Sequence, residues 1–397
     1  MKNLCGSPVD GDDFIFREGE LSLIISALTE GNSVLLLGLR KLGKSSVLRE
    51  TKRRLETESD AKCLLINMET MERPSDLFLA IISALPKSKK EQFKTYFARS
   101  RRIPSELRNT VIGWFTKGGF SGVSVELDKE VRDYWNPLSD AIDQLIETDV
   151  ENRPILLLDE LPLFLLNLLD RGYDASHMRL ILGTLKSWRE KGLAMACCGS
   201  INLDAVLDDK QVSKSVLGGL IRVELKPFSE AEIRELLSKV MKTRKWWRDH
   251  HADIVLEHVP DCIPYFHQLA AQYLRSQFPN EAGPSNDEVA NVVREDVVRQ
   301  ITKAFLYQFD ERIKASRYDP PVMRQSAKLL LNRLAKEPGD IVSEATALKW
   351  LKGMDVDGNA LLSQLVMDEF LWENNQSQFQ FSLEILRRWW LRRGDEL

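Results

Sequence analysis

The sequence lacks the patterns of several specialised protein classes. Its five cysteines form no C-x-x-C pair and no cluster with histidine, so neither a zinc site nor a disulfide framework is expected. No apolar run approaches the length of a membrane span and no signal-peptide pattern is seen, so the sequence predicts a cytoplasmic protein without a membrane partner. The net charge of -4 gives the chain as a whole no general attraction for nucleic acid or anionic lipid.

The composition is that of a long globular chain. Its 397 residues exceed one ordinary hydrophobic core, so two or three domains are expected. Up to residue 226, short apolar runs alternate with helical patterns, which predicts an α/β domain built on a parallel sheet. Four or five strands are predicted, from the runs at residues 34–37, 62–67, 154–160, 193–200 and 220–225.

Two further domains are predicted after this α/β domain. Residues 227–317 are helical in pattern, with a capping box at Ser229 and several proline breaks, and we interpret them as an all-α lid. Residues 318–397 combine three helices, two short alternating arms around a polar turn, and a last helix. That order of elements is typical of a winged-helix domain.

A phosphate-binding motif follows the first predicted strand. Residues 38–45 fit G-x-x-x-x-G-K-[ST], a match that arises by chance in about one chain in a hundred of this length. The glycines let backbone N–H groups face an anion, and the helix that follows adds its positive end. Lys44 would reach the β- and γ-phosphates, and the Ser45 hydroxyl would hold Mg²⁺. The predicted loop contacts are Gly38, Leu39, Arg40, Lys41, Leu42, Gly43, Lys44, Ser45 and Ser46.

Two acids end the third predicted strand. Four apolar residues lead directly into Asp159 and Glu160, as in a central strand buried on both faces. We expect Asp159 to orient Mg²⁺ through water and Glu160 to act as general base on the attacking water. The alternative is that the acids only cap the next helix, but the phosphate loop upstream favours catalysis. Ser200, or Asn202 just after it, stands behind the fourth strand where a polar side chain could sense the γ-phosphate, although Gly-Ser is also common turn chemistry.

Residues 87–130 are interpreted as an insertion in the α/β domain. Its first part, residues 87–108, carries eight basic and two acidic side chains. A solvated helical face is the favoured interpretation, and contact with nucleic acid or an acidic partner is the alternative. Residues 111–127 contain glycine breaks and an alternating stretch, which indicates a short strand or hairpin arm.

The predicted winged helix has little positive charge for DNA. After residue 318 there are ten basic and twelve acidic side chains, and its third helix, residues 358–370, carries Asp368 and Glu369 but no lysine or arginine. A recognition helix without a cation would face phosphates unaided, so a packing or protein-contact role is favoured. The basic, aromatic stretch 242–248 in the lid is likewise interpreted as packing.

Together these pieces give the chain a family resemblance. The Phe16-Arg17-Glu18-x-Glu20-Leu21 lead-in, the loop 38–46, Leu158-Asp159-Glu160, Gly199-Ser200 and Ile263-Pro264-Tyr265-Phe266 resemble the archaeal-type ATPases and their relatives in the STAND class of P-loop NTPases, and more distantly the AAA+ origin-recognition initiators. The resemblance implies strand order 5-1-4-3-2, a helical lid and a C-terminal winged helix. It also implies ATP with Mg²⁺, Phe16 and Arg17 beside the base and ribose, and Pro264 as the lid proline at the nucleotide.

The chain departs from the family pattern at a few positions. Asp261 and Cys262 stand where glycines usually precede the lid proline, which puts the lid contact in doubt. No arginine finger is evident, and Arg189 or Arg222 could act in trans only in an oligomer.

The resemblance implies an ATP-dependent conformational switch. ATP or ADP would fix the arrangement of lid and winged helix, and slow Mg²⁺-dependent hydrolysis through Glu160 would reset it. Such proteins belong to prokaryotic defence, signalling or mobile-element systems, with a protein partner or self-association through the lid and winged helix. The alternatives are a DNA-binding AAA+-like ATPase of initiator or transposition type, using residues 87–108 and 387–393, and a scaffold that keeps ATP as a structural ligand.

Overall fold

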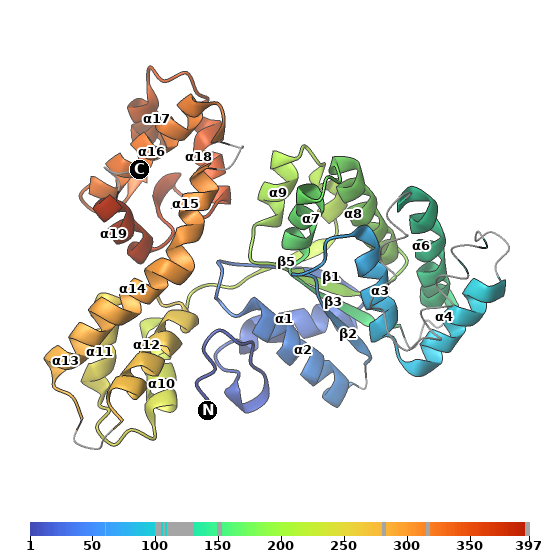
Figure 1. Cartoon of the computed structure of the whole chain (residues 1–397), viewed down its shortest axis with the longest axis horizontal. Coiled ribbons are helices and arrows are strands. Elements are labelled where there is room, and N and C mark those ends of the chain that lie inside the picture. The colour runs from blue at the N-terminus through green and yellow to red at the C-terminus, as the bar shows by residue number, and fades with distance from the viewer. Residues whose placement is uncertain are drawn as a thin grey trace. The chain divides into compact units, whose positions relative to one another are not determined.

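The computed structural model describes residues 1–59, 61–99, 131–148, 153–279, 283–314 and 318–393, together with residues 105 and 108 (Figure 1). They fall into two compact units. The sheet unit comprises Pro8–Gly38 and Gly43–Leu225, and the helical unit comprises Met1–Ser7, Leu39–Leu42 and Lys226–Leu397. The four central residues of the phosphate loop therefore group with the helical unit.

The described residues of the sheet unit form one five-stranded parallel sheet. Read from β5, the strand order is 5-1-4-3-2, which confirms the order implied by the family resemblance. Every residue of β3 is buried, as expected for an apolar strand covered on both faces. The strands are β1 (Ser33–Leu37), β2 (Cys63–Asn67), β3 (Ile155–Asp159), β4 (Met195–Cys198) and β5 (Leu220–Glu224).

Helices cover both faces of this sheet (Figure 1). Helices α1 (Glu18–Thr29) and α2 (Lys44–Glu58) lie on one side. On the other side, alternate strand residues such as Leu35 and Leu156 share one apolar core with the remaining helices. These are α3 (Pro74–Ala84), α4 (Lys87–Arg99), α6 (Val131–Thr148), α7 (Leu161–Asp170), α8 (Ala175–Glu190) and α9 (Leu203–Asp209).

The first part of the predicted insertion is the amphipathic helix α4. Its Phe93 and Phe97 are fully buried with stacked rings 5.1 Å apart, and the helix contacts α6. The basic side chains of α4 thus belong to a helix anchored by aromatic packing. Apart from residues 105 and 108, residues 100–130 lie outside the described part of the chain, and so does the predicted arm at 111–127.

The predicted lid is helical throughout its described residues. Its helices are α10 (Glu230–Met241), α11 (Asp249–His258), α12 (Pro264–Gln277) and α13 (Asn286–Asn291). Trp246 is 7% exposed and donates from Nε1 to the Phe278 carbonyl at 3.2 Å, so it packs as predicted. Among the helices that the structure describes, none is both long and apolar enough to cross a bilayer.

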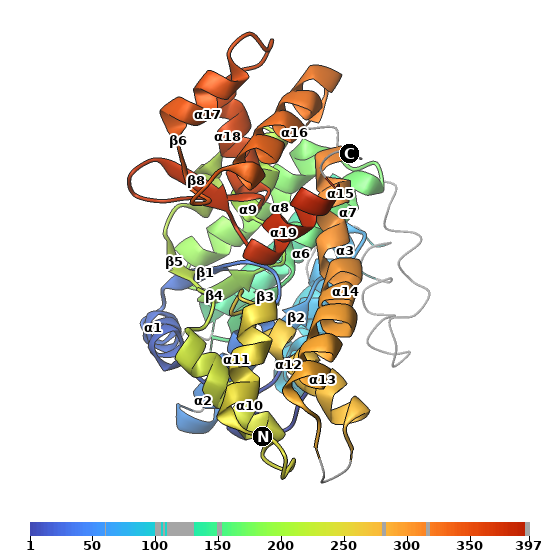
Figure 2. The same ribbon diagram turned by 90° about the vertical axis from the view of Figure 1, so that its left-hand side faces the viewer.

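A connecting helix, residues 286–314, begins with α13 and continues to the end of α15 (Figure 2). Two π-helical segments, Val292–Val297 and Thr302–Leu306, alternate in it with α14 (Val298–Ile301) and α15 (Tyr307–Lys314). A π turn shifts the register of the backbone hydrogen bonds, and such turns occur often at functional positions.

The C-terminal module, residues 318–393, contains four helices and a small antiparallel sheet in the order β6-β8-β7. These are the helices and strands that the sequence predicts there, with the two-residue strand β6 added. Their assignment as a winged helix stays a prediction. The elements are α16 (Pro321–Lys336), β6 (Val342–Ser343), α17 (Glu344–Leu351), α18 (Gly358–Met367), β7 (Leu371–Glu373), β8 (Gln378–Phe381) and α19 (Glu384–Arg393).

Candidate nucleotide site

The loop between β1 and α2 has the backbone of an anion-binding nest. Gly38, Lys41 and Gly43 all have positive φ, at 136°, 71° and 95°. Turns of this kind bring successive N–H groups to one concave side. Gly43 is also the N-cap of α2, and because it has no side chain it cannot cap the first helical N–H groups itself. The positive end of α2 therefore faces the loop.

The ammonium group of Lys44 is held inside this loop. The residue is 6% exposed, and Nζ donates to the carbonyl oxygen of Gly38 at 2.6 Å. A buried ammonium is costly unless negative groups surround it. Phosphate oxygens would add negative charge in the place where the motif predicts them.

Strand register brings Asp159 to the same edge of the sheet as the loop. β4 lies between β1 and β3, with Leu36 opposite Cys198 and Leu158 opposite Cys197. The Cys198 thiol donates to Oδ1 of Asp159 at 3.0 Å. Burial, together with the charge of this carboxylate, raises the pKa of Cys198 well above its ordinary value, so the thiol stays protonated and remains a donor.

Glu160 is placed for a task other than helix capping. It is the N-cap of α7 with φ 62°, yet its side chain makes no capping hydrogen bond. Oε2 instead accepts hydrogen bonds from both N–H and Oγ–H of Ser200, each at 2.8 Å. The capping alternative is therefore wrong for this side chain, and Ser200 contacts the predicted base.

Gly199 makes this contact possible. A Cβ at position 199 would lie 2.4 Å from Cδ and 2.8 Å from Cγ of Pro162 in the first turn of α7. Only glycine lets the end of β4 pass so close to that ring. Pro162 was not among the predicted site residues, although a proline directly after the acid pair and Leu161 is visible in the sequence.

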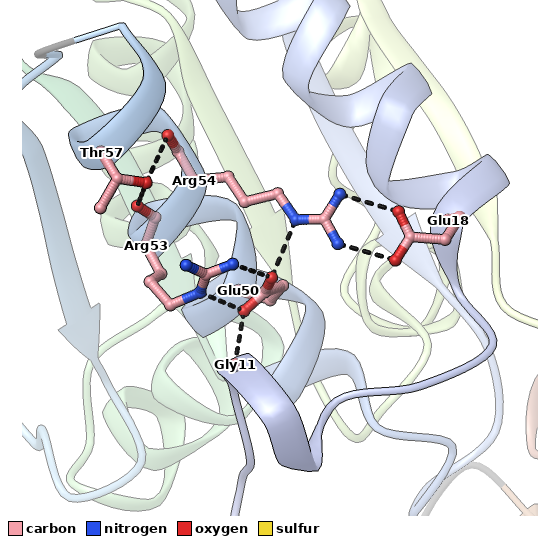
Figure 3. A network of polar contacts seen from close by, with 6 residues as sticks. All are labelled: Gly11, Glu18, Glu50, Arg53, Arg54 and Thr57. Atoms are coloured by element: carbon pink, nitrogen blue, oxygen red, sulfur yellow. Dashed lines mark hydrogen bonds and ion pairs between the residues drawn. The ribbon is translucent and has the colours of Figure 1, made fainter.

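The segment before α1 is hydrogen-bonded to side chains of α2 (Figure 3). Ser46, predicted as a nucleotide contact, accepts the N–H of Val9 at 3.1 Å, and Glu50 accepts the N–H of Gly11 at 2.8 Å. Glu50 is 1% exposed and also accepts hydrogen bonds from Arg53 and Arg54. Burial alone would raise the pKa of Glu50, but the two arginines and the Gly11 N–H outweigh it and bring the pKa down to about 2.

Arg54 ties α1 into the same network. Its Nη1 and Nη2 each donate to Glu18 at 2.7 Å, while its Nε donates to Glu50 (Figure 3). The segment between Gly11 and Glu18, which contains the predicted base and ribose neighbours, is therefore fixed at both ends.

Phe16 and Arg17 lie in this fixed segment. Phe16 has φ 62°, a strained conformation for a bulky side chain and one that is concentrated at functional sites. Arg17 is 5% exposed and pairs with Glu20 at 2.9 Å. Their contacts with a base and ribose stay predictions, and so does the role of Pro264, the first residue of α12 in the helical unit.

The departure from the family pattern at Asp261 has a structural reason. Its two carboxylate oxygens accept the N–H groups of Glu384 at 2.8 Å and Ile385 at 2.7 Å. Asp261 thus caps α19, so the turn before Pro264 is bonded directly to the C-terminal module. A glycine could not make this connection.

Ser45 and Asp159 are suitable ligands for Mg²⁺ in company with a nucleotide. Both offer oxygen, the donor that this hard cation prefers. No group of three or more His, Cys, Asp or Glu side chains in the described residues could hold a metal by itself.

The two arginines considered as fingers are engaged within their own chain. Arg222 makes two hydrogen bonds to Asp204, at 2.6 and 2.9 Å. Arg189 donates to the carbonyls of Gly218 and Val216 at 3.1 and 2.6 Å. Either would have to give up these partners to act in trans.

No protein-family model matches the sequence, and no curated protein matches it. Similarity appears among solved structures, and it defines the fold as that of an archaeal-type P-loop ATPase with origin-recognition-like architecture. The Walker-type ATPase of Pyrococcus abyssi has a TM-score of 0.60 at 17% identity, over 96% of this chain and 97% of its own. The ORC2 protein of Aeropyrum pernix, solved as ADPNP–ADP complexes, has a TM-score of 0.58 at 12% identity, over 98% of this chain and 95% of its own.

Proposed function

We propose that the protein is an ATP-binding P-loop ATPase that acts as a nucleotide-dependent conformational switch. The observation that carries this proposal is the register across β1, β4 and β3, which gathers the loop lysine and both acids at one sheet edge. The fold supports it, since the similar solved structures include a Walker-type ATPase and a protein complexed with ADPNP and ADP.

In this proposal each part of the site has a separate task. The N–H groups of the loop and Lys44 bind the phosphates, and Phe16 and Arg17 flank the base and ribose. Ser45 and Asp159 hold Mg²⁺, which neutralises phosphate charge when it is bound. Pro264 is the proposed lid residue that contacts the nucleotide, on the family resemblance.

Glu160 is the proposed general base, and its surroundings favour slow hydrolysis. A base must accept a proton from water through a carboxylate oxygen. The two Ser200 donors occupy Oε2, so an attacking water must compete with Ser200 for this oxygen. The same contact fixes the position of the Glu160 carboxylate between turnovers.

Two variants test this proposal. Lys44→Ala should abolish ATP binding in a titration, whereas Glu160→Gln should bind ATP and lose phosphate release by about 10²–10⁴-fold. Lys186→Ala and Glu190→Gln, which alter an exposed pair on α8, serve as matched controls. Unchanged ATP affinity in Lys44→Ala would overturn the assignment. Intact ATP on both wild type and Glu160→Gln would instead identify a scaffold with a structural nucleotide.

DNA binding, through residues 87–108 and 387–393, is the less favoured function, and α18 does not add to it. The acids after this helix have packing partners: Tyr318 donates to Asp368 at 2.7 Å, and Arg312 pairs with Glu369 at 3.0 Å. The helix still supplies no cation for a phosphate. Duplex binding that weakens steeply with salt would favour the alternative.

A protein partner fits these contacts better. We assign the switch to a prokaryotic defence, signalling or mobile-element system, on the family resemblance alone. Co-purification of a partner that depends on ATP and is lost in Lys44→Ala would support this role.

A further inference from the structure

The central part of the phosphate loop, Leu39–Leu42, belongs to the helical unit and contacts other residues of it. Lys41 Nζ lies 4.8 Å from the centre of the Tyr265 ring, and Leu42 is 2% exposed. Arg40 Nη1 donates to Oε1 of Gln308, at 3.4 Å, in α15. The loop that would bind phosphate thus also contacts the connecting helix.

Gln308 is shared between this loop and the C-terminal module. Its Oε1 accepts a second hydrogen bond, from Arg312 Nη2 at 3.2 Å. Arg312 in turn donates from Nη1 to the carbonyl of Asp368 at 2.6 Å and to the carboxylate of Glu369 at 3.0 Å. A continuous chain of polar contacts therefore joins Arg40 to the end of α18.

Gln308 is also incompletely satisfied. Its Nε2 is buried without a hydrogen-bond partner. A buried N–H group without an acceptor costs free energy, so an arrangement that pairs it would be favoured. The second π segment, Thr302–Leu306, ends just before α15, so the backbone register next to Gln308 is already shifted.

We propose that Arg40 and Gln308 report the occupancy of the phosphate loop to the C-terminal module through Arg312. The inference rests on the proposed nucleotide function. A guanidinium binds phosphate by charge-assisted hydrogen bonds, which are shorter and stronger than its long bond to a neutral amide. Phosphate in the loop therefore takes Arg40 from Gln308, and Gln308 and Arg312 rearrange at the end of α18.

Because coupling is reciprocal, two substitutions at Gln308 have opposite effects on binding. Gln308→Leu removes the competing acceptor at similar volume, so the nucleotide binds as tightly as in wild type or more tightly. Gln308→Glu attracts Arg40 and Arg312 with a full charge, so the affinity for the nucleotide falls by about fivefold or more. Lys303→Gln, at an exposed position of the connecting helix, is the matched control.

Hydrogen exchange of the full-length protein, with and without a non-hydrolysable ATP analogue, tests the relay. In wild type and Lys303→Gln the analogue should change exchange in residues 364–373 by about fivefold or more. Gln308→Leu should bind the analogue and lose this response.

Each other result has its own meaning. Wild type that fails to bind the analogue disproves the proposed function itself. Wild type that binds without a response at 364–373, or two Gln308 variants that both bind and respond as wild type does, disproves the relay alone. Should Gln308→Leu fail to fold, the affinity of Gln308→Glu decides.

Discussion

The N–H and hydroxyl groups of Ser200 both donate to the same carboxylate oxygen of Glu160, each at 2.8 Å. This contact joins the end of β4 to the start of α7. The contact depends on both residues of the Gly199-Ser200 pair. Ser200 supplies the two donors, and Gly199 has no Cβ that would collide with Pro162.

Ser200→Ala should speed up ATP turnover. It removes one of the two donors that occupy Oε2 of Glu160, so water reaches this oxygen more easily, and the loss of one charge-assisted hydrogen bond limits the gain to about tenfold. ATP affinity should be unchanged, and Ser200→Thr, which keeps a hydroxyl, should behave as wild type. Phosphate release measures the effect. Slower release in Ser200→Ala would mean that the hydroxyl acts on the γ-phosphate, as the sequence alone predicts.

Gly199→Ala should destabilise the sheet unit and reduce turnover. Its Cβ would press into the Pro162 ring and displace α7 from β4, a type of overpacking that costs about 1–3 kcal/mol. Gly183→Ala is the control, because nothing lies within 4 Å of a Cβ there and the site is helical. It should gain about 0.5–1 kcal/mol. Urea unfolding compares the two, and equal stabilities would contradict the packing argument.

Glu50→Gln should lower the free energy of unfolding and weaken the attachment of the segment before α1 to α2. The buried carboxylate accepts from two arginines and the Gly11 N–H, and loss of its charge should cost about 1.5–3 kcal/mol of unfolding free energy. Because the folded pKa of Glu50 is depressed to about 2, this stabilisation is present above pH 4.5 and is lost as pH falls toward 2. Weaker ATP binding should accompany it.

Glu58→Gln provides the comparison, since it removes an exposed carboxylate at the end of the same helix. Its unfolding free energy should stay within about 0.5 kcal/mol of wild type. A similar loss in both variants would show that the network around Glu50 contributes little.

His267 and Asp261 should give the helical unit opposing pH dependences. Burial lowers the pKa of His267 to about 4, so its contribution to stability is present above pH 6.5 and is lost as pH falls to 4. Burial raises the pKa of Asp261 to about 6, despite hydrogen bonds from the Ile385 and Glu384 N–H groups, so its ionisation costs stability as pH rises through 6.

Unfolding free energies measured between pH 4 and 6.5 separate the two groups. His267→Gln should remove an acid-side loss of up to about 3 kcal/mol. In Asp261→Asn the unfolding free energy should fall more steeply as pH is lowered. The opposing contribution of Asp261 is then absent, and that of His267 remains. Parallel pH profiles for wild type and both variants would contradict these assignments.

Much of the fold could be predicted from the sequence, because the strands are continuous apolar runs and the helices begin and end at clear signals. Ser229 predicted the start of α10, and the apolar run before Asp159 predicted a central strand. The strand order came from the family resemblance. The strand β6 was missed because two residues carry no alternation, and the π segments because residues 286–314 have an ordinary helical pattern.

The site was predictable in its motifs but not in its contacts. Lys44, Asp159 and Glu160 stand in recognisable patterns along the chain. The contact of Gly199 with Pro162, the capping of α19 by Asp261 and the bond from Arg40 to Gln308 join residues far apart in sequence. No local pattern encodes such pairs, since they depend on how finished elements pack.

The place of β1 in the sheet has a consequence for synthesis. Its two neighbours, β4 and β5, begin only at Met195 and Leu220, so a nascent chain carries β1 without a strand partner until most of the sheet unit has left the ribosome. The loop and its lysine can be assembled only after that point. Fragments that stop before β4 should therefore fail to fold around the loop, however complete their motif.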